Sequence, residues 1–234
     1  MTWAKGAAMA DEGRVARRRA HVRSRILEVA RELIEERGID AVTIDEIADA
    51  ADIARRSFYL HFASKNDVLV PVARARTKEI NARIDRRVAE FDDPARVMAT
   101  AMRYTLRLFS ADPLCSWFVL HSGLPHQRLQ EGVGESAMRD AARGVEVGRF
   151  QIANQEIVRT LISGAFLAAM SARVEGRIDD GDLDDAVEHI LRLLGVSVID
   201  AQELAHEPLP AMRAAPRAVF RSGKAIPRAE APRR

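Results

Sequence analysis

The chain of 234 residues is 47% hydrophobic and 30% charged, and its 36 basic and 34 acidic side chains leave a formal net charge of +2. This length suffices for one large domain, or for a small and a larger one, each with a buried core. The near balance of charge excludes a strong overall field of the kind that marks many polyanion-binding proteins. Any nucleic-acid interaction must therefore depend on where the charges lie.

Cysteine usage and hydropathy indicate the compartment. The single cysteine, Cys115, cannot form an internal disulfide, and no Cys/His cluster has the spacing of zinc ligands. We expect no apolar run of the about 20 residues that span a bilayer, and the N-terminus lacks the apolar stretch of a signal peptide. These features predict a cytoplasmic protein with no membrane contact, no metal and no cofactor.

Positive charge is concentrated at the two ends of the chain. From Gly13 to Arg25 every charged residue is an arginine, and acidic residues return only at Glu28. The stretch after His206 carries seven basic and two acidic residues among five prolines. We expect residues 1–16 to be a flexible basic arm and residues 207–234 a disordered tail. Each of them either is simply solvated or reaches DNA.

Helical periodicity dominates between these ends, which predicts an all-α fold. The first helix is expected from about Arg17 to Arg37, with Ile26, Ala30 and Ile34 on one stripe and a stop at Gly38.

Two short helices with a tight turn are expected next. Thr43 precedes an apolar pattern at helical spacing, and Glu46, three residues later, completes a capping box. A second helical segment runs from Ala54 to Phe62 after a break at Asp52-Ile53, and Phe58 and Phe62 point together into a small core. Ser64 then caps a further helix that begins near Lys65. This arrangement predicts a helix-turn-helix.

The run T-I-D-E-I-A-D-A-A-D-I-A-R-R-S-F-Y-L-H-F-A-S-K-N-D-V-L, from Thr43 to Leu69, resembles the DNA-binding signature of the tetracycline-repressor (TetR-like) family. The resemblance covers about a quarter to a third of the chain, counted with the first helix. It implies an N-terminal three-helix helix-turn-helix DNA-binding domain at residues 17–65. It also implies a larger C-terminal helical domain, at residues 66–206, that binds a ligand and dimerises.

The resemblance also implies which residues meet DNA. It makes Ala54 to His61 the recognition helix, with Arg55 and Arg56 as the candidates for base edges, since a guanidinium can pair with guanine O6 and N7. His61 is a candidate for either bases or phosphates. The positions that match phosphate-holding residues of the family are Thr43, Ser57, Tyr59 and Lys65.

Three residues depart from the family pattern. Asp52 stands where the turn usually has glycine, and aspartate is among the side chains that tolerate a left-handed backbone. Ala54 replaces the usual Ser or Thr cap, which removes about 1 kcal/mol of capping. Leu60 is apolar where a polar residue is common, so it either contacts a thymine methyl or packs.

Aromatic and methionine residues gather in the middle of the chain. Their spacing is typical of a core, but together with a few polar side chains they could also line a pocket for a small apolar or amphipathic ligand, and Arg103 is a candidate polar anchor. The candidate ligand-binding residues are Met102, Tyr104, Trp117, Phe118, His121 and Phe166.

Two long amphipathic patterns end the folded part, from about Asn154 to Val174 and from about Asp182 to Leu204. The resemblance implies that the last two helices pair with their symmetry mates in a homodimer. Packing within one chain is the alternative.

The residues and the resemblance together favour a ligand-responsive transcriptional repressor that binds a pseudo-palindromic double-stranded DNA operator as a homodimer. The alternative is a helical protein that binds a small molecule or a partner and binds DNA weakly or non-specifically. No nucleophile elbow, phosphate-binding loop, dinucleotide fingerprint or metal-spaced His/Glu set occurs. We therefore expect no enzyme and no catalytic residue.

Overall fold

The structure is a computed structural model that describes residues 2–129, 135–152 and 154–212. Within these residues all regular secondary structure is helical, which confirms the all-α prediction. The helices are α1 (Thr2–Arg37), α2 (Ile44–Ala50), α3 (Arg55–Phe58), α4 (Lys65–Val88), α5 (Pro94–Ala111), α6 (Pro113–His121), α7 (Pro125–Leu129), α8 (Glu135–Glu146), α9 (Gln155–Val174), α10 (Asp180–Leu193) and α11 (Val198–His206).

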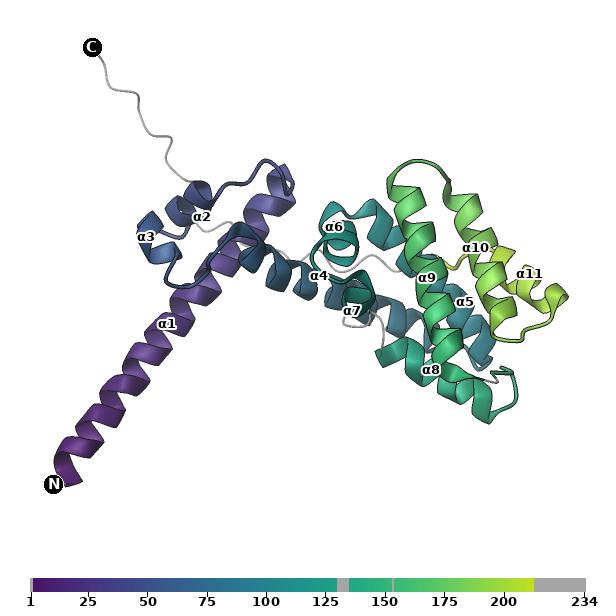
Figure 1. Ribbon diagram of the computed structural model, residues 1–234, viewed down its shortest axis with the longest axis horizontal. Coiled ribbons are helices and arrows are strands. Elements are labelled where there is room, and N and C mark those ends of the chain that lie inside the picture. Colours follow the sequence, from purple (N-terminus) through teal and green to yellow (C-terminus); the bar gives the residue numbers. More distant parts are fainter. Residues whose placement is uncertain (1, 130–134, 153, 213–234) are drawn as a thin grey trace, which may run out of the picture.

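The helices form two lobes that α4 connects (Figure 1). The smaller lobe consists of α1, α2, α3 and the start of α4. In the larger lobe α5 is central and packs against α4, α6, α8, α9, α10 and α11. Helix α4 belongs to both lobes, since it packs against α1 in the small lobe and against α5 and α6 in the large lobe.

The core of the small lobe forms from the apolar positions that the sequence pattern marks. Ile26 of α1, Ile47 of α2 and Phe58 of α3 are fully buried. Phe58 and Phe62 pack with their ring centroids 5.8 Å apart, as their spacing predicts. This core fixes α3 against α1 and α2 and leaves the opposite side of α3 exposed.

Side-chain caps begin the two helices that flank α3. The Thr43 hydroxyl accepts from the Glu46 backbone N–H while the Glu46 carboxylate accepts from the Thr43 N–H, so the predicted capping box is confirmed. Ser64 and Asp67 form the same box at the start of α4. The turn between α2 and α3 takes Asp52 to a φ of 57°, which confirms that aspartate serves here in place of glycine.

The first helix differs from the sequence-based expectation. It begins at Thr2 rather than near Arg17, so the segment expected to be a flexible arm continues the helix. The sequence of these early residues shows no apolar stripe, and apolar periodicity can reveal a helix only where one of its faces is apolar.

Two further boundaries also differ. The segment expected to form the recognition helix, Ala54 to His61, is called the recognition segment below. It is helical only over Arg55–Phe58 and then continues in turns, with His61 N donating to Phe58 O at 2.9 Å. The pattern from Asp182 to Leu204 divides into α10 and α11, because Gly195 adopts a φ of 84° that ends the first helix. The apolar spacing continues across that break, so the pattern does not reveal it.

Helix α9 also departs from the expectation of no membrane-length apolar run. Over an 18-residue window its mean hydropathy is 1.4, so by length and composition it could cross a bilayer. One of its faces contributes Phe166 and Met170 to the core, while Ile157 and Leu161 on another face are exposed. A helix that packs on two sides, against the core and against a partner, has this composition as well.

Candidate nucleic-acid interface and ligand pocket

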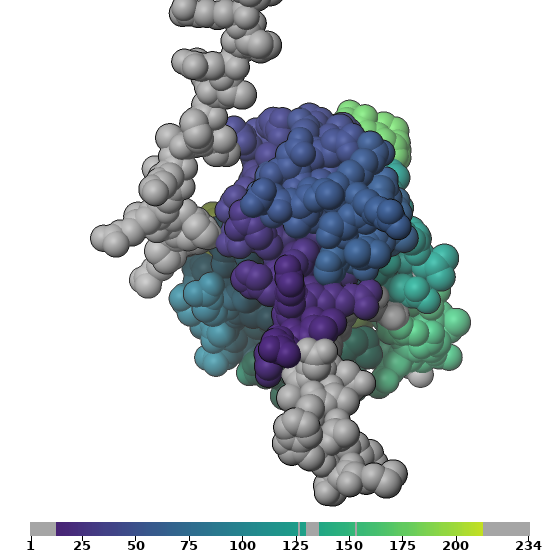
Figure 2. Space-filling view, turned by 90° about the vertical axis from the view of Figure 1, so that its left-hand side faces the viewer, coloured from purple at the N-terminus to yellow at the C-terminus, as the bar shows by residue number. Residues whose placement is uncertain are grey.

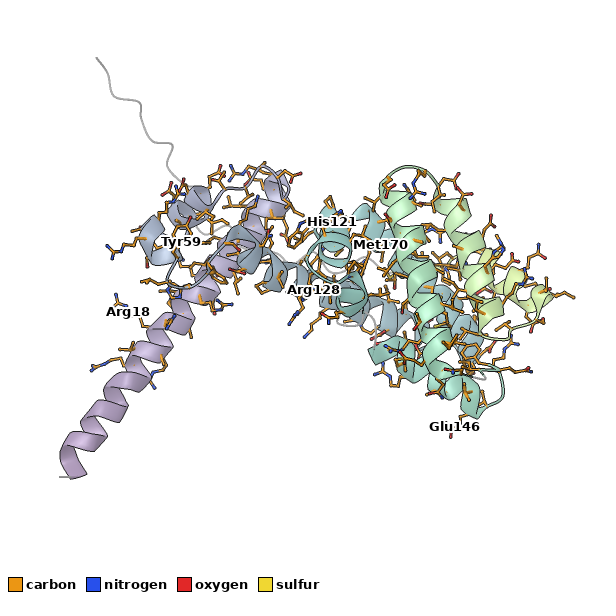
Figure 3. The ribbon with its side chains drawn as sticks, in the orientation of Figure 1. Arg18, Tyr59, His121, Arg128, Glu146 and Met170 are labelled. Carbon is orange, nitrogen blue, oxygen red and sulfur yellow. The ribbon has the colours of Figure 1, made fainter. Side chains whose placement is uncertain are left out.

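The exposed side of α3 carries two arginines and a tyrosine. Arg55 and Arg56 are exposed, and Tyr59, which ends α3, is 44% exposed. Figure 3 shows Tyr59 on the side of the small lobe that faces away from the large lobe. This side of α3 is therefore accessible to a large partner such as a DNA duplex.

Arg55 is held in place by a neighbouring carboxylate. Its Nη1 lies 2.8 Å from Oδ2 of Asp45 on α2, and both side chains are more than half exposed. A hydrogen bond with Tyr59, followed by the charge of Asp45, raises the pKa of Arg55. Asp45 orients the guanidinium, but it also places a negative charge at the surface that would approach phosphates.

The predicted phosphate-holding residues surround α3, but some of their polar atoms already have partners. The Thr43 hydroxyl donates to Glu46 at 2.8 Å. The Lys65 ammonium donates to the carbonyl of Ile39 at 2.6 Å, and its two remaining protons stay available. Ser57 is half-buried on α3. Their contact with phosphates stays a prediction.

His61 and Leu60 follow α3 at the same end of the lobe. Burial, followed by the charges of Arg19 and Arg23, lowers the pKa of His61, which favours the neutral imidazole. A neutral imidazole attracts a phosphate less than a charged one. Leu60 is 65% exposed, so of the two alternatives the sequence left open, packing does not occur.

Two arginines of α1 donate hydrogen bonds to the backbone of the recognition segment, a role that the sequence pattern does not reveal. Arg19 donates to the carbonyl of Leu60 at 3.0 Å, and Arg23 donates to that of His61 at 2.9 Å. Arg23 also lies over the Phe62 ring, 4.0 Å from its centroid. The run of arginines in the sequence predicts a solvent-exposed surface. Only the fold shows that Arg19 and Arg23 donate to the backbone of the recognition segment.

The large lobe contains a cavity of about 550 Å³, within the range of small-molecule sites. Of the six candidate ligand-binding residues, Met102 and Phe166 line this cavity, and the other four are not among its lining residues. It lies among α4, α5, α8 and α9, with most of its lining apolar. The apolar lining includes Ile84, Met98, Met102, Met138, Val145, Ile152, Val158, Ile162 and Phe166.

The other four candidates lie around the central helix in different environments. Tyr104 and Phe118 are buried in the core, Trp117 is half-buried, and His121 is exposed at the end of α6. Figure 3 shows His121 on α6, beside the connecting helix. Aromatic content alone could not show which side of α5 encloses the cavity.

Arg103, the candidate anchor, is committed elsewhere. Its guanidinium is buried and forms two hydrogen bonds with the Asp184 carboxylate, at 2.8 and 3.0 Å. Arg107 donates to the same carboxylate at 2.8 Å. This ion cluster joins α5 to α10 and does not line the cavity.

The polar lining of the cavity is mainly acidic and hydroxylic. Asp85 of α4 accepts a hydrogen bond from the Ser136 hydroxyl at 3.0 Å. Burial, opposed by Arg139 and reinforced by the charge of Asp85, raises the pKa of Asp140. Arg159 also lines the cavity, and its guanidinium is bonded to Glu156. Sequence reasoning missed Asp85 and Asp140, although Asn81 and Asp85 are polar residues one helical turn apart and flank the buried Ile84 of α4.

Two other groups of reactive side chains lie outside both sites. Cys115 is fully buried, and burial raises the pKa of its thiol, so it behaves as a small apolar residue. Asp185, Glu188 and His206 bring one ligand atom each within 4.8 Å of the others on α10 and at the end of α11. His206 Nε2 lies 3.3 Å from the Glu188 carboxylate, which accounts for the cluster as an ion pair when the imidazole is protonated.

Comparison with known proteins assigns both lobes to one family. Residues 26–72 match the model described as bacterial regulatory proteins, tetR family, and residues 93–207 match the model of the tetracyclin repressor-like C-terminal domain. The chain belongs to the tetR family. The two matches fall on the small and the large lobe respectively, so the resemblance carried by Thr43 to Leu69 is confirmed.

Among solved structures, this tetR-family chain is similar to RolR in complex with resorcinol. The two are 32% identical with a TM-score of 0.75, over 85% of this chain and 100% of RolR. RolR without ligand is 30% identical with a TM-score of 0.69, over 81% and 100% of the two chains. FadR of Thermus thermophilus, at 24% identity and a TM-score of 0.56 over 74% of this chain and 92% of FadR, shares the fold.

Among curated proteins, the chain is 29% identical over 104 residues to an uncharacterized HTH-type transcriptional regulator of Mycobacterium tuberculosis, Rv1255c. That match covers 44% of this chain and 52% of the relative. YvdT of Bacillus subtilis, another HTH-type transcriptional regulator, is 41% identical over 49 residues, which are 21% of this chain and 25% of YvdT. The chain thus spans about half or less of the length of these relatives.

Proposed function

We propose that this tetR-family protein is a ligand-responsive transcriptional repressor that binds a pseudo-palindromic operator as a homodimer in the cytoplasm. The observation that carries the proposal is the separation of two sites along one helix. Lys65 begins α4 beside the recognition segment, and Asn81, Ile84 and Asp85 of the same helix line the cavity. At 1.5 Å per residue, these ends are about 25–30 Å apart.

An exposed apolar stripe supports the homodimer. Ile157 and Leu161 on α9 are 56% and 51% exposed, and Ala168 lies on the same side about two turns further on. At Gly164, between them, an added Cβ would meet no atom within 4 Å, so the surface there is open. Large apolar side chains flanked by small ones allow a second helix to approach closely. A two-fold axis through this face would pair two recognition helices for two half-sites.

The cavity supports a neutral ligand that donates hydrogen bonds. RolR has been solved with resorcinol, a neutral aromatic diol. Here the carboxylates of Asp85 and Asp140 can accept from such hydroxyls, and they would repel a carboxylate ligand. A volume of about 550 Å³ leaves room for more than a single aromatic ring. The ligand class we propose is an aromatic or aliphatic alcohol with a substantial apolar body.

A gel-shift titration with the DNA upstream of its own gene tests DNA binding. We expect a specific complex, which Arg55→Ala and Arg56→Ala each weaken by about 10- to 100-fold, since a bidentate base contact contributes about 1–3 kcal/mol. Arg177→Ala, which changes an exposed arginine of the large lobe, is the matched control. Equal binding by all four proteins would contradict the assignment of α3 as the reader.

A thermal-shift comparison of resorcinol with 3-hydroxybenzoate tests the ligand class. The two probes differ by one carboxylate in place of one hydroxyl, so we expect stabilisation by resorcinol only. Asp140→Asn should reduce the difference between the stabilisation by resorcinol and that by 3-hydroxybenzoate. Stabilisation by the benzoate alone would contradict the proposed class and leave the proposed DNA binding intact.

The Asp45–Arg55 ion pair favours a second candidate, a helical ligand-binding protein whose DNA binding is weak and non-specific. A carboxylate at 2.8 Å competes with DNA for the arginine, and the N-cap residue of α3, Ala54, has no side chain that could cap the helix. In that case affinity would fall equally for all sequences as salt rises, with no preference left at 200 mM salt. That the protein is not an enzyme stays a prediction under both candidates.

A further inference from the structure

Helix α1 extends well beyond the domain that it helps to build. From Gly13 onward, the first buried side chain of α1 is that of Ile26, and every residue from Arg14 to His21 is exposed. Figure 1 shows this part of α1 projecting past α2 and α3. In Figure 2, which views the molecule from the side of the small lobe, α1 continues directly below the surface formed by α2 and α3. The extension is therefore continuous with the candidate DNA-binding face.

The direction of the extension is fixed relative to α3. The bonds from Arg19 to Leu60 O and from Arg23 to His61 O tie α1 to the end of the recognition segment. Arg25 donates to the carbonyl of Ala51, just before the turn that leads into α3, at 3.0 Å. These contacts position the projecting helix whenever the recognition segment docks.

The extension presents positive charge on a defined side. Arg14, Arg18, His21 and Arg25 follow one another at four, three and four residues, which places them on one side of a helix. Arg25 of this stripe reaches the turn before α3. Figure 3 shows Arg18 pointing to the side on which Tyr59 lies. Between Gly13 and Leu27 the helix carries no acidic residue, while Asp11 and Glu12 directly precede this stretch.

We propose that Arg14 and Arg18 bind the phosphates of the DNA that flanks each operator half-site, extending the footprint beyond the part that α3 reads. From Arg25 to Arg14 the helix spans about 16 Å, which equals about five base-pair steps. Phosphate contacts at this distance add affinity and register and carry no sequence information. The inference rests on the proposed operator binding.

The test uses two operator duplexes, one limited to the half-sites and one with about ten additional base pairs on each side. The double variant Arg14→Gln/Arg18→Gln is compared with the wild type by fluorescence anisotropy. On the long duplex we expect affinity to fall at least tenfold. The slope of log affinity against log salt should become shallower by about 3–4 for a dimer, since each phosphate contact contributes about 0.9. On the short duplex the two proteins should bind equally.

The control variant Arg86→Gln/Arg177→Gln removes the same charge from exposed positions of the large lobe and should bind both duplexes like the wild type. Circular dichroism checks that α1 stays helical. Equal affinity and slope on the long duplex would overturn the proposal and make the stripe a solvated surface. A loss confined to flanks rich in A·T pairs would overturn the phosphate assignment in favour of minor-groove reading.

Failure of the proposed function gives a different result. If no duplex forms a sequence-specific complex and Arg55→Ala has no effect, operator reading fails, and the same double variant is measured on random DNA. A reduced salt slope there supports the phosphate contacts of α1, and an unchanged slope overturns them.

Discussion

At the residue scale, one carboxylate stands out because its charge opposes the proposed function of the surface on which it lies. Asp45 is exposed beside Arg55 on the side that would face phosphates. Asp45 therefore orients the Arg55 guanidinium but also reduces the electrostatic attraction of this surface to DNA.

Replacing Asp45 with asparagine should therefore strengthen DNA binding. We expect affinity for random DNA to rise severalfold, because a repulsive charge is lost and Arg55 is released. Operator affinity should rise less, because the orientation of Arg55 is also lost. Anisotropy at two salt concentrations measures both. Glu203→Gln, at an exposed position of α11, is the control, and weaker binding to random DNA by Asp45→Asn would contradict this account.

A second carboxylate, Asp184, acts on stability. Burial alone would raise the pKa of Asp184, but the hydrogen bonds from Arg103 and Arg107 outweigh it and hold the pKa below its usual value of 3.8. The contribution of this carboxylate to the free energy of unfolding is thus fully present above pH 3.8 and is lost as pH falls through the lower folded pKa.

Asp184→Asn should lower the free energy of unfolding by about 3 kcal/mol at pH 7, because Arg103 stays buried without a counter-charge. Urea denaturation at pH 7 and at decreasing pH measures the loss. The difference from the wild type should shrink below the usual aspartate pKa. Asp185→Asn serves as the control. Asp182→Asn would not be suitable, because Asp182 belongs to the capping box of α10. An equal effect of Asp184→Asn at pH 7 and pH 3 would contradict the ion-cluster explanation.

At the scale of elements, α9 combines membrane-like hydropathy with an incompletely covered surface. Its hydropathy arises from two apolar faces, one packed on the core and one carrying Ile157 and Leu161 into solvent. The proposed dimer covers the second face.

Leu161→Glu should therefore weaken the dimer by at least about 100-fold, since the two-fold axis would bury two uncompensated carboxylates. Sedimentation velocity over a range of concentrations measures the change. Val147→Glu places the same charge at a 61% exposed position before α9 and should leave the dimer intact. A Leu161→Glu protein that stays dimeric would move the interface elsewhere.

At the scale of the whole molecule, α4 connects the cavity with the recognition segment. If a ligand in the cavity lowers operator affinity by some factor, the operator must lower ligand affinity by the same factor, because the two equilibria are linked. A factor of about 5–150 is typical of such coupling.

Calorimetric titration of a cavity ligand, with and without operator DNA, checks this reciprocity. The probe is resorcinol, or the most stabilising dihydroxybenzene if resorcinol is weak. In the Arg55→Ala/Arg56→Ala protein, operator DNA should leave ligand affinity unchanged. For the wild type, the ligand could change operator affinity by a different factor than the operator changes ligand affinity. This result would show that the ligand acts outside the two-site equilibrium, for example by dissociating the dimer.

Features that depend on neighbours along the chain could be predicted from the amino-acid sequence. Capping residues such as Thr43 and Ser64, the left-handed Asp52, and the i, i+4 pair Phe58 and Phe62 all act within one or two turns, so their types and spacing specify local structure. The same locality explains why the helix-turn-helix and the all-α class could be predicted.

Features that depend on contacts between segments distant in sequence became visible only in the folded chain. The fold placed Arg19 and Arg23 against the backbone of the recognition segment, and it brought Asp85 and Asp140 to a cavity that excludes Tyr104 and Phe118. Apolar periodicity reports that a side chain is buried, but not which neighbour buries it or which gap is left unfilled. A helical segment without an apolar stripe, such as the start of α1, leaves no periodic trace in the sequence.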